Sequence, residues 1–183
     1  KFSWRSTPDK VSVHLSQRAF IESVLSQFGF HHESTSFKPT SYRSGHPVDA
    51  IQDSDISLQQ RHKLEHLLRR MVGSLNWLSQ ATRPDITTIT SILAKFQHFP
   101  SPGHIGAARH VLKYLNGTKH LGIAFHSDKY FDIKLQLSAA TDANWGPQDH
   151  SVPSNHQSPD LDLFKTRSIS GHLLAFHGPL HWS

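Results

Sequence analysis

"SLNWLSQATRPDITTITSILAKF", residues 74–96, is the stretch that decides how the centre of the chain folds. Apolar residues recur at three- and four-residue spacing on both sides of residues 82–85, which is the pattern of two helices joined at a corner. Pro84 suits the first turn of the second helix, and Asp85 favours its positive end. Arg83 then has two interpretations, an ion pair with a neighbouring carboxylate such as Asp85 or a contact with phosphate.

Two further helix signals flank this corner. Ser57 followed by Gln60 is a capping-box pattern, so the helix before the corner is expected to start there and end near residue 80. Pro102 and Gly117 have the positions of a helix start and a helix stop around a third apolar stripe. Three striped helices with short links are expected to pack as a compact bundle.

The amino-terminal part predicts a hairpin and one more helix. Apolar residues alternate on both sides of a Thr-Pro-Asp turn in residues 2–15, which indicates two antiparallel strands. Ser16 is then the expected cap of a helix over residues 17–28, which Gly29 ends. Residues 31–56 are rich in Ser, Thr, Pro and Gly and are interpreted as an extended connector.

The carboxy-terminal part changes to a period of two. Strand patterns follow residue 118, the first two separated by a polar turn at residues 127–129, and residues 146–164 form a Pro-, Ser- and Asp-rich loop between later strands. The chain is therefore expected to have an α+β fold: an N-terminal β-hairpin, a bundle of three to four helices, and then a mixed sheet.

Composition restricts the possible functions. The 183 residues carry a net charge of +5 with histidine neutral, and the 16 histidines add positive charge as the pH falls, so a polyanionic partner is one interpretation and a soluble basic surface is the other. Cysteine is absent, which excludes disulfides and thiolate metal sites. No run of eighteen apolar residues is present, so a membrane partner is not expected.

Two longer strings resemble a known family. "MVGSLNWLSQATRPDI" from Met71 and "FQHFPSPGHIGAARHVLKYLNGTKHLGIAF" from Phe96 are similar to the carboxy-terminal part of reverse transcriptases from copia-type LTR retrotransposons. Upstream, "VHLSQRAFIESVLSQFGF" looks like the segment after the polymerase palm. Downstream, "ATDANWG", "TRSISGH" and "LHWS" look like the opening strands of the family's ribonuclease H domain.

The resemblance implies a placement for each part. Residues 1–16 would be the hairpin that supports the primer terminus, residues 17–118 the thumb, and residues 119–183 an incomplete ribonuclease H-like sheet. The expected partners are an RNA/DNA hybrid or DNA duplex and the remainder of the polymerase, the palm and fingers. The expected location is a cytoplasmic retroelement particle, or the nucleus.

Catalysis is expected to be incomplete in this chain. Polymerisation requires paired carboxylates that hold two metal ions, and the family's Tyr-Val-Asp-Asp signature would lie upstream. Of the ribonuclease H carboxylates only Asp142 matches, as a ligand for Mg²⁺ once the remaining carboxylates are supplied; a turn-forming carboxylate is the alternative. The sequence departs from the family pattern at Asn144, where aspartate is usual, and at His172, where tyrosine is usual.

Nucleic-acid binding does not require these carboxylates. Cations on the thumb helices are expected to meet phosphates, and an ordinary solvated face is the alternative. Arg109 and Lys113 are four residues apart and share a helix face. Trp4 and Arg5 are candidates for primer contact, although core packing is the favoured interpretation of Trp4. The full candidate set is Arg69, Arg70, Arg83, Lys95, Arg109, Lys113, Lys119, Trp4 and Arg5.

Two rival functions remain. The first is a domesticated or residual interaction domain without enzymatic activity. The second is a zinc-binding hydrolase, because His62, Glu65 and His66 fit the inverted zinc-protease pattern of two histidines four residues apart with an adjacent glutamate. Lys63 within that pattern opposes a metal charge.

Overall fold

The computed structural model describes residues 1–30, 38–41, 57–128, 138–144, 169–175 and 179–182. The chain divides into two compact units, Lys1–Phe131 and Asp132–Ser183. Most of the expected connector and the whole of the expected loop 146–164 lie outside the described residues. None of the described helices combines the length and the apolar composition that crossing a membrane requires. The α+β class is confirmed.

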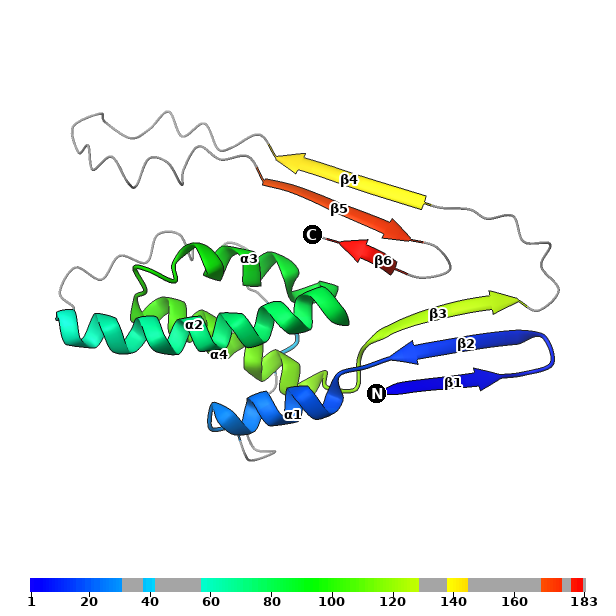
Figure 1. Ribbon diagram of the computed structural model, residues 1–183, viewed down its shortest axis with the longest axis horizontal. Coiled ribbons are helices and arrows are strands. Elements are labelled where there is room, and N and C mark those ends of the chain that lie inside the picture. Colours follow the sequence, from blue (N-terminus) through cyan, green and yellow to red (C-terminus); the bar gives the residue numbers. More distant parts are fainter. Residues whose placement is uncertain (31–37, 42–56, 129–137, 145–168, 176–178, 183) are drawn as a thin grey trace. The chain divides into compact units, whose positions relative to one another are not determined.

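The helices of the first unit are α1 (Arg18–Gln27), α2 (Leu58–Ala81), α3 (Thr87–Lys95) and α4 (Pro102–Gly117) (Figure 1). A 3₁₀ turn, η2 (Pro84–Ile86), lies at the corner between α2 and α3. The predicted cap at Ser57 is present, since its side chain accepts from the backbone N–H of Gln60 while Gln60 reaches back. Gly29 has a positive φ of 82°, as the predicted stop after α1 requires.

One cap expectation was wrong. Gln17, and not Ser16, is the N-cap of α1, and neither provides a side-chain capping bond to this helix. The Ser16 backbone is instead tied to the first residue, because its N–H donates to the Lys1 carbonyl at 2.9 Å. The side chain of Gln17 is used elsewhere and accepts a 2.8 Å hydrogen bond from Thr82 Oγ1.

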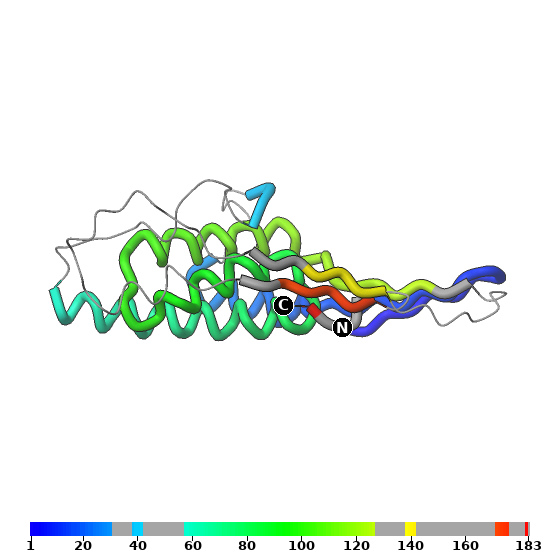
Figure 2. The backbone as a smooth tube through the Cα atoms, turned by 90° about the horizontal axis from the view of Figure 1, so that it is seen from above, coloured from blue at the N-terminus to red at the C-terminus, as the bar shows by residue number. Residues whose placement is uncertain are grey.

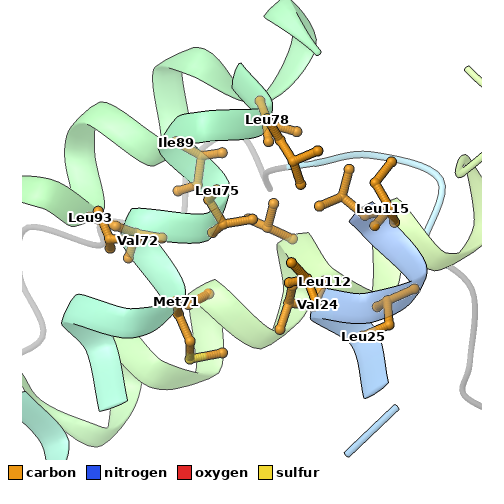
Figure 3. Packing of buried hydrophobic residues seen from close by; sticks show 14 of the residues in the cluster. Val24, Leu25, Met71, Val72, Leu75, Leu78, Ile89, Leu93, Leu112 and Leu115 are labelled. Carbon is orange, nitrogen blue, oxygen red and sulfur yellow. The ribbon is translucent and has the colours of Figure 1, made fainter. Parts of the chain in front are cut away.

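All four helices share a single apolar core. Figure 3 shows apolar side chains from the four helices meeting in one cluster: Val24 and Leu25 of α1, Met71, Val72, Leu75 and Leu78 of α2, Ile89 and Leu93 of α3, and Leu112 and Leu115 of α4. Leu68, Leu75, Leu78, Leu93 and Leu112 are fully buried. Because the stripes of the helices face one another, the polar faces of α2 and α4 are left to solvent.

The hairpin strands β1 (Phe2–Ser6) and β2 (Lys10–Leu15) pair antiparallel, as predicted. A third strand, β3 (Ile123–Asp128), pairs with β2 in the order β1-β2-β3, and the three lie side by side (Figure 2). The expected domain boundary at residue 118 therefore differs from the structure, in which β3 belongs to the first unit. The cause is that α1, which follows β2, packs against α4, which precedes β3.

This sheet has two unlike faces. The register aligns Phe2 with Leu15 and Ile123, and Trp4 with Val13 and Phe125, so one face is apolar. Serine, arginine and histidine side chains occupy the other face. The apolar face is not fully covered, because Phe2 is 63% and Trp4 67% exposed.

The second unit contains a three-stranded antiparallel sheet of β4 (Ser138–Asn144), β5 (Ile169–Ala175) and β6 (Pro179–Trp182). β4 pairs with β5, and β5 pairs with β6 through a register irregularity at Leu174 and Ala175. This sheet contains Asp142 in β4, opposite Gly171.

Candidate nucleic-acid interface

The corner after α2 is held by a buried arginine. Arg83 is 1% exposed and donates to both carboxylate oxygens of Asp85, at 3.0 Å from Nε and 2.7 Å from Nη2. It also donates to the Thr118 carbonyl at 3.0 Å and to Thr118 Oγ1 at 2.7 Å. The guanidinium lies over the Tyr114 ring, 5.4 Å from its centroid. Arg83 thus ties the start of η2 to the end of α4.

The electrostatics of this corner follow from these contacts. Burial raises the pKa of Asp85, but hydrogen bonds from Arg83 and Tyr114 outweigh it, so the pKa of Asp85 is lowered from its ordinary value. Burial and the hydrogen bond to Asp85 raise the pKa of Tyr114. The Tyr114 hydroxyl donates to Asp85 Oδ2 at 2.7 Å.

Arg83 is not available to contact phosphate. Its side chain is inside the protein and its donors are directed at Asp85 and Thr118, so no phosphate reaches it without disrupting the corner. Of the two interpretations that the sequence left open, the ion pair with Asp85 is the one observed, at 2.7 Å.

The pair Arg109 and Lys113 lies on α4 outside the core. Arg109 is exposed and Lys113 half-buried, whereas Ala108, Val111 and Leu112 between and beside them are buried. Neither cation forms an ion pair with another residue in the described part of the chain. These two positive charges are therefore adjacent on one helix face, and no carboxylate among the described residues forms an ion pair with them.

The two arginines of α2 have neighbours on different sides. Arg69 forms an ion pair with Glu65 at 2.6 Å and a 3.0 Å hydrogen bond with His98 Nδ1. Arg70 places its guanidinium over the Phe28 ring, 5.7 Å from the centroid. Both side chains remain exposed, so each can still meet a ligand from solvent.

Lys95 and Lys119 are the remaining candidate cations. Lys95 is exposed in the last turn of α3, where its charge suits the helix dipole. Lys119 is half-buried after α4 and is close enough to α1 to contribute to the lowered pKa of Glu22, whose main cause is the hydrogen bond from Arg18. Lys95 and Lys119 thus follow different helices, and the pair Arg109 and Lys113 on one face of α4 is the best defined group of candidate cations.

Trp4 and Arg5 project from opposite faces of β1, because side chains alternate along a strand. The favoured interpretation of Trp4 as a core residue was wrong, since it is 67% exposed. Alternation identifies the apolar face of a strand but does not show whether anything covers that face. Arg5 is exposed on the polar face, beside Ser12 of β2.

The metal hypotheses are not supported by the described side chains. The structure describes the backbone of Asp142 but not its side chain. In the described part of the chain there is no group of three or more His, Cys, Asp or Glu residues able to hold a metal ion. At the proposed zinc motif, His62 Nδ1 lies 3.6 Å from Glu65, but Glu65 also binds Arg69, whose charge opposes a metal ion there.

Two features were missed in the sequence. His104 is 2% exposed and forms the capping box of α4 with Ser101, and its ring stacks on Phe96 at 4.2 Å. Trp77 is 60% exposed on the outer face of α2. The signal for Trp77 was available, because it lies on the helix face opposite the buried Leu75 and Leu78 stripe.

Comparison with known proteins places this chain within longer ones. No protein-family model and no solved structure matches the chain. It is 32% identical over 148 residues to the retrovirus-related Pol polyprotein from transposon RE1 of Arabidopsis thaliana, which covers 78% of this chain and 9% of that protein. It is 38% identical over 88 residues to the corresponding polyprotein from transposon RE2, also of Arabidopsis thaliana, which covers 48% of the chain and 6% of that protein.

A third relative is shorter. The secreted RxLR effector protein 161 of Plasmopara viticola is 29% identical over 107 residues, which is 58% of this chain and 63% of that protein. The chain spans less than a tenth of the length of the two polyproteins. Its homologues are thus the copia-type retrovirus-related Pol polyproteins of transposons, and the chain corresponds to a short segment of them.

Proposed function

We propose that the chain is the thumb and the beginning of the ribonuclease H region of a retrotransposon reverse transcriptase, and that it binds template-primer or an RNA/DNA hybrid. In this proposal the hairpin β1–β2 supports the primer, and cations of the helical unit contact the phosphate backbone. Homology to transposon Pol polyproteins supports the origin of the segment. The exposed pair of cations on α4 supports the binding.

The observation that carries the proposal is the pair Arg109 and Lys113 on α4. The two side chains lie one turn apart outside the core, and neither is neutralised by a carboxylate among the described residues. Cations placed in this way bind phosphates and release counterions, which gives affinity without sequence preference. Lys95, Arg69 and Arg70 would add contacts on neighbouring helices.

Catalysis would require other parts of the polyprotein. The residues that the structure describes do not fit a magnesium site, because no group of potential ligands converges among them. Asp142 would serve as one ligand only in a complete ribonuclease H domain, in which Mg²⁺ would activate water for phosphodiester hydrolysis. We assign no reaction step to this chain alone.

The apolar face of the β1–β3 sheet supports a second part of the proposal, contact with the remainder of the polymerase. Phe2 and Trp4 leave large aromatic rings in solvent, and exposed apolar patches of this kind mark protein interfaces. The palm and fingers are the proposed partner because the homologous polyproteins are more than ten times longer than the matched segment. The proposed location is a cytoplasmic retroelement particle, or the nucleus.

The binding proposal is tested with fluorescence anisotropy on a labelled RNA/DNA hybrid. The double variant R109Q/K113Q should weaken binding at least fivefold at about 50 mM salt, because two phosphate contacts are lost. The control Q59S/N76Q changes exposed polar residues of α2 without removing charge, and it should leave the affinity unchanged. Equal affinity of R109Q/K113Q and wild type would refute the assignment to α4.

A non-enzymatic interaction domain is the second candidate function. The shorter relative favours it, because 63% of that protein consists of the region matched to this chain, so the region also occurs outside long polyproteins. This candidate predicts binding to a protein with an affinity that does not change with salt. Salt-dependent binding to a hybrid, with no such protein complex, would exclude it.

A further inference from the structure

Strand β1 is an edge of the sheet β1-β2-β3 (Figure 1). Its hydrogen bonds to β2 are fixed at both ends of the hairpin. Lys1 and Ser16 exchange backbone hydrogen bonds at one end, and the Thr7 N–H donates to the Lys10 carbonyl at 2.8 Å at the other. Bonded and non-bonded residues alternate along an antiparallel pair. The odd-numbered residues from 1 to 7 therefore bond to β2 through their backbone, and the even-numbered residues between them direct their backbone groups to the open edge.

The residues at the open edge are Phe2, Trp4 and Ser6. In the part of the chain that the structure describes, no other strand pairs with this edge. Phe2 is 63% and Trp4 67% exposed, so the unpaired backbone groups and the exposed aromatic rings belong to the same residues. An edge of this kind is a template on which a further strand can be added.

β1 has few of the features that protect edge strands, which are proline, a bulge or several charges. It contains no proline, pairs with β2 in an unbroken register, and has Arg5 as its charged residue. Strand β6 of the second unit, by contrast, starts with Pro179 and joins β5 through a register irregularity. The β3 edge of the first sheet differs as well, because its Ile123 is 8% exposed. The β1 edge is therefore the described edge best suited to pairing.

A second copy of the same strand fits this edge. Two β1 strands related by a twofold axis run antiparallel, and they bond only through residues whose backbone groups point outward. An axis through Trp4 gives the longest overlap, because it pairs Phe2 with Ser6 of the second copy, Trp4 with Trp4, and Ser6 with Phe2. An axis through Ser3 or Arg5 gives fewer such pairs. The axis through Arg5 also sets two like charges opposite each other, which is unfavourable.

The side chains agree with the axis through Trp4. In this register Arg5 lies opposite Ser3 of the second copy, so no like charges face each other. The two Trp4 rings lie side by side on the apolar face, and cross-strand aromatic pairs stabilise a sheet. From these observations we infer that β1 pairs antiparallel with β1 of a second copy of this chain, with Trp4 opposite Trp4, and joins the two sheets into one. This inference goes beyond the proposed function and does not depend on nucleic-acid binding.

Sedimentation equilibrium of the full chain without nucleic acid measures the pairing. Wild type should form a dimer whose fraction rises with protein concentration. W4K sets two positive charges opposite each other and removes the aromatic pair, so the dissociation constant of the dimer should rise about tenfold or more. The matched control W77K makes the same change at a tryptophan that is 60% exposed on α2, and it should leave the dissociation constant unchanged. An equimolar mixture of W4K and W4E should regain the association, since opposite charges then face each other.

Cysteine cross-linking tests the register. The chain contains no cysteine, so a single introduced thiol forms a disulfide only between two copies. Directly opposite residues of a hydrogen-bonded pair have Cα atoms about 5.5 Å apart, which a disulfide can bridge. W4C should therefore cross-link under mild oxidation. R5C should not, because the two copies of residue 5 are displaced along the strands, with Cα atoms about 8 Å apart.

Three results would overturn the inference. They are a wild-type chain that stays monomeric at every concentration, a W77K variant whose dimer is weakened as much as that of W4K, and equal cross-linking of W4C and R5C. Because no nucleic acid is present, each of these results leaves the proposed function intact. Unchanged far-UV circular dichroism and Tm establish that W4K is folded.

Discussion

Removing the Arg83 guanidinium should destabilise the helical unit strongly. In R83A, two hydrogen bonds from a charged donor to Thr118 are lost in the interior, at about 1.5 kcal/mol each. The pair with Asp85 adds up to about 1 kcal/mol, discounted because the Asp85 side chain is 35% exposed and screened by water. The expected loss in the free energy of unfolding is thus about 3–4 kcal/mol.

Urea unfolding followed by far-UV circular dichroism measures this loss. The described α-helices all belong to the first unit, so the helical signal reports the unit that contains Arg83. R109A removes an exposed arginine from the same unit and should change the free energy of unfolding by less than about 0.5 kcal/mol. R83K keeps the charge but not the planar fork, so it should fall between wild type and R83A.

The ion pair between buried Arg83 and Asp85 also predicts the sign of a double-mutant cycle. R83A leaves the Asp85 carboxylate without its cation, whereas R83A/D85N does not leave that charge unpaired. The double variant should therefore lose less stability than the sum of the two single losses. A loss below about 1 kcal/mol in R83A, or strict additivity in the cycle, would refute the role given to this corner.

Three further outcomes follow from the structure. The pKa of Asp85 is lowered in the folded state, so this carboxylate contributes stability that is fully present above its unfolded pKa of about 4 and is lost as the pH falls through the folded pKa. The difference in unfolding free energy between wild type and D85N should therefore shrink from pH 5 to pH 3 in urea titrations. A constant difference would contradict this. S101A should lower the Tm of the helical unit, through a loss of about 1 kcal/mol, because the α4 capping box is removed, and an unchanged Tm would contradict the buried cap. G122A should disrupt the pairing of β3 with β2, because the added Cβ would lie 2.1 Å from the Leu15 carbonyl oxygen. G106A, whose Cβ would meet nothing within 4 Å, should raise the free energy of unfolding by up to about 1 kcal/mol. Equal effects of the two variants in thermal unfolding would refute this contrast.

The helices could be predicted because their signals are local. Ser57, Pro84, Pro102 and Gly117 each act through the nearest turn of backbone, and the apolar stripes between them fix which face is buried. The predicted cap was wrong where a residue distant in the sequence binds the capping residue. Ser16 did not cap α1, and its backbone N–H instead donates to the carbonyl of Lys1, just before β1.

The order of the strands in the sheet depends on contacts between residues far apart in the sequence, which hydrophobic periodicity does not reveal. β3 joins β2 only because α1 and α4 pack and bring the two strand ends together across a long sequence separation. The same holds for the candidate site. The Arg83 pair with Asp85 is local and could be anticipated, whereas Thr118, 35 residues away, could not. The exposure of Trp4 depends on whether another surface covers its strand, which its own sequence does not specify.

The salt dependence of hybrid binding shows whether Arg109 and Lys113 of α4 contact phosphates. A plot of log K against log salt, from about 50 to 200 mM, should be linear with a negative slope for wild type, and R109Q/K113Q should reduce its magnitude by about 2, one for each phosphate contact. If the slope is near zero for wild type, or if it is the same in both proteins, the helical unit does not bind a phosphate backbone through α4 and the account is contradicted.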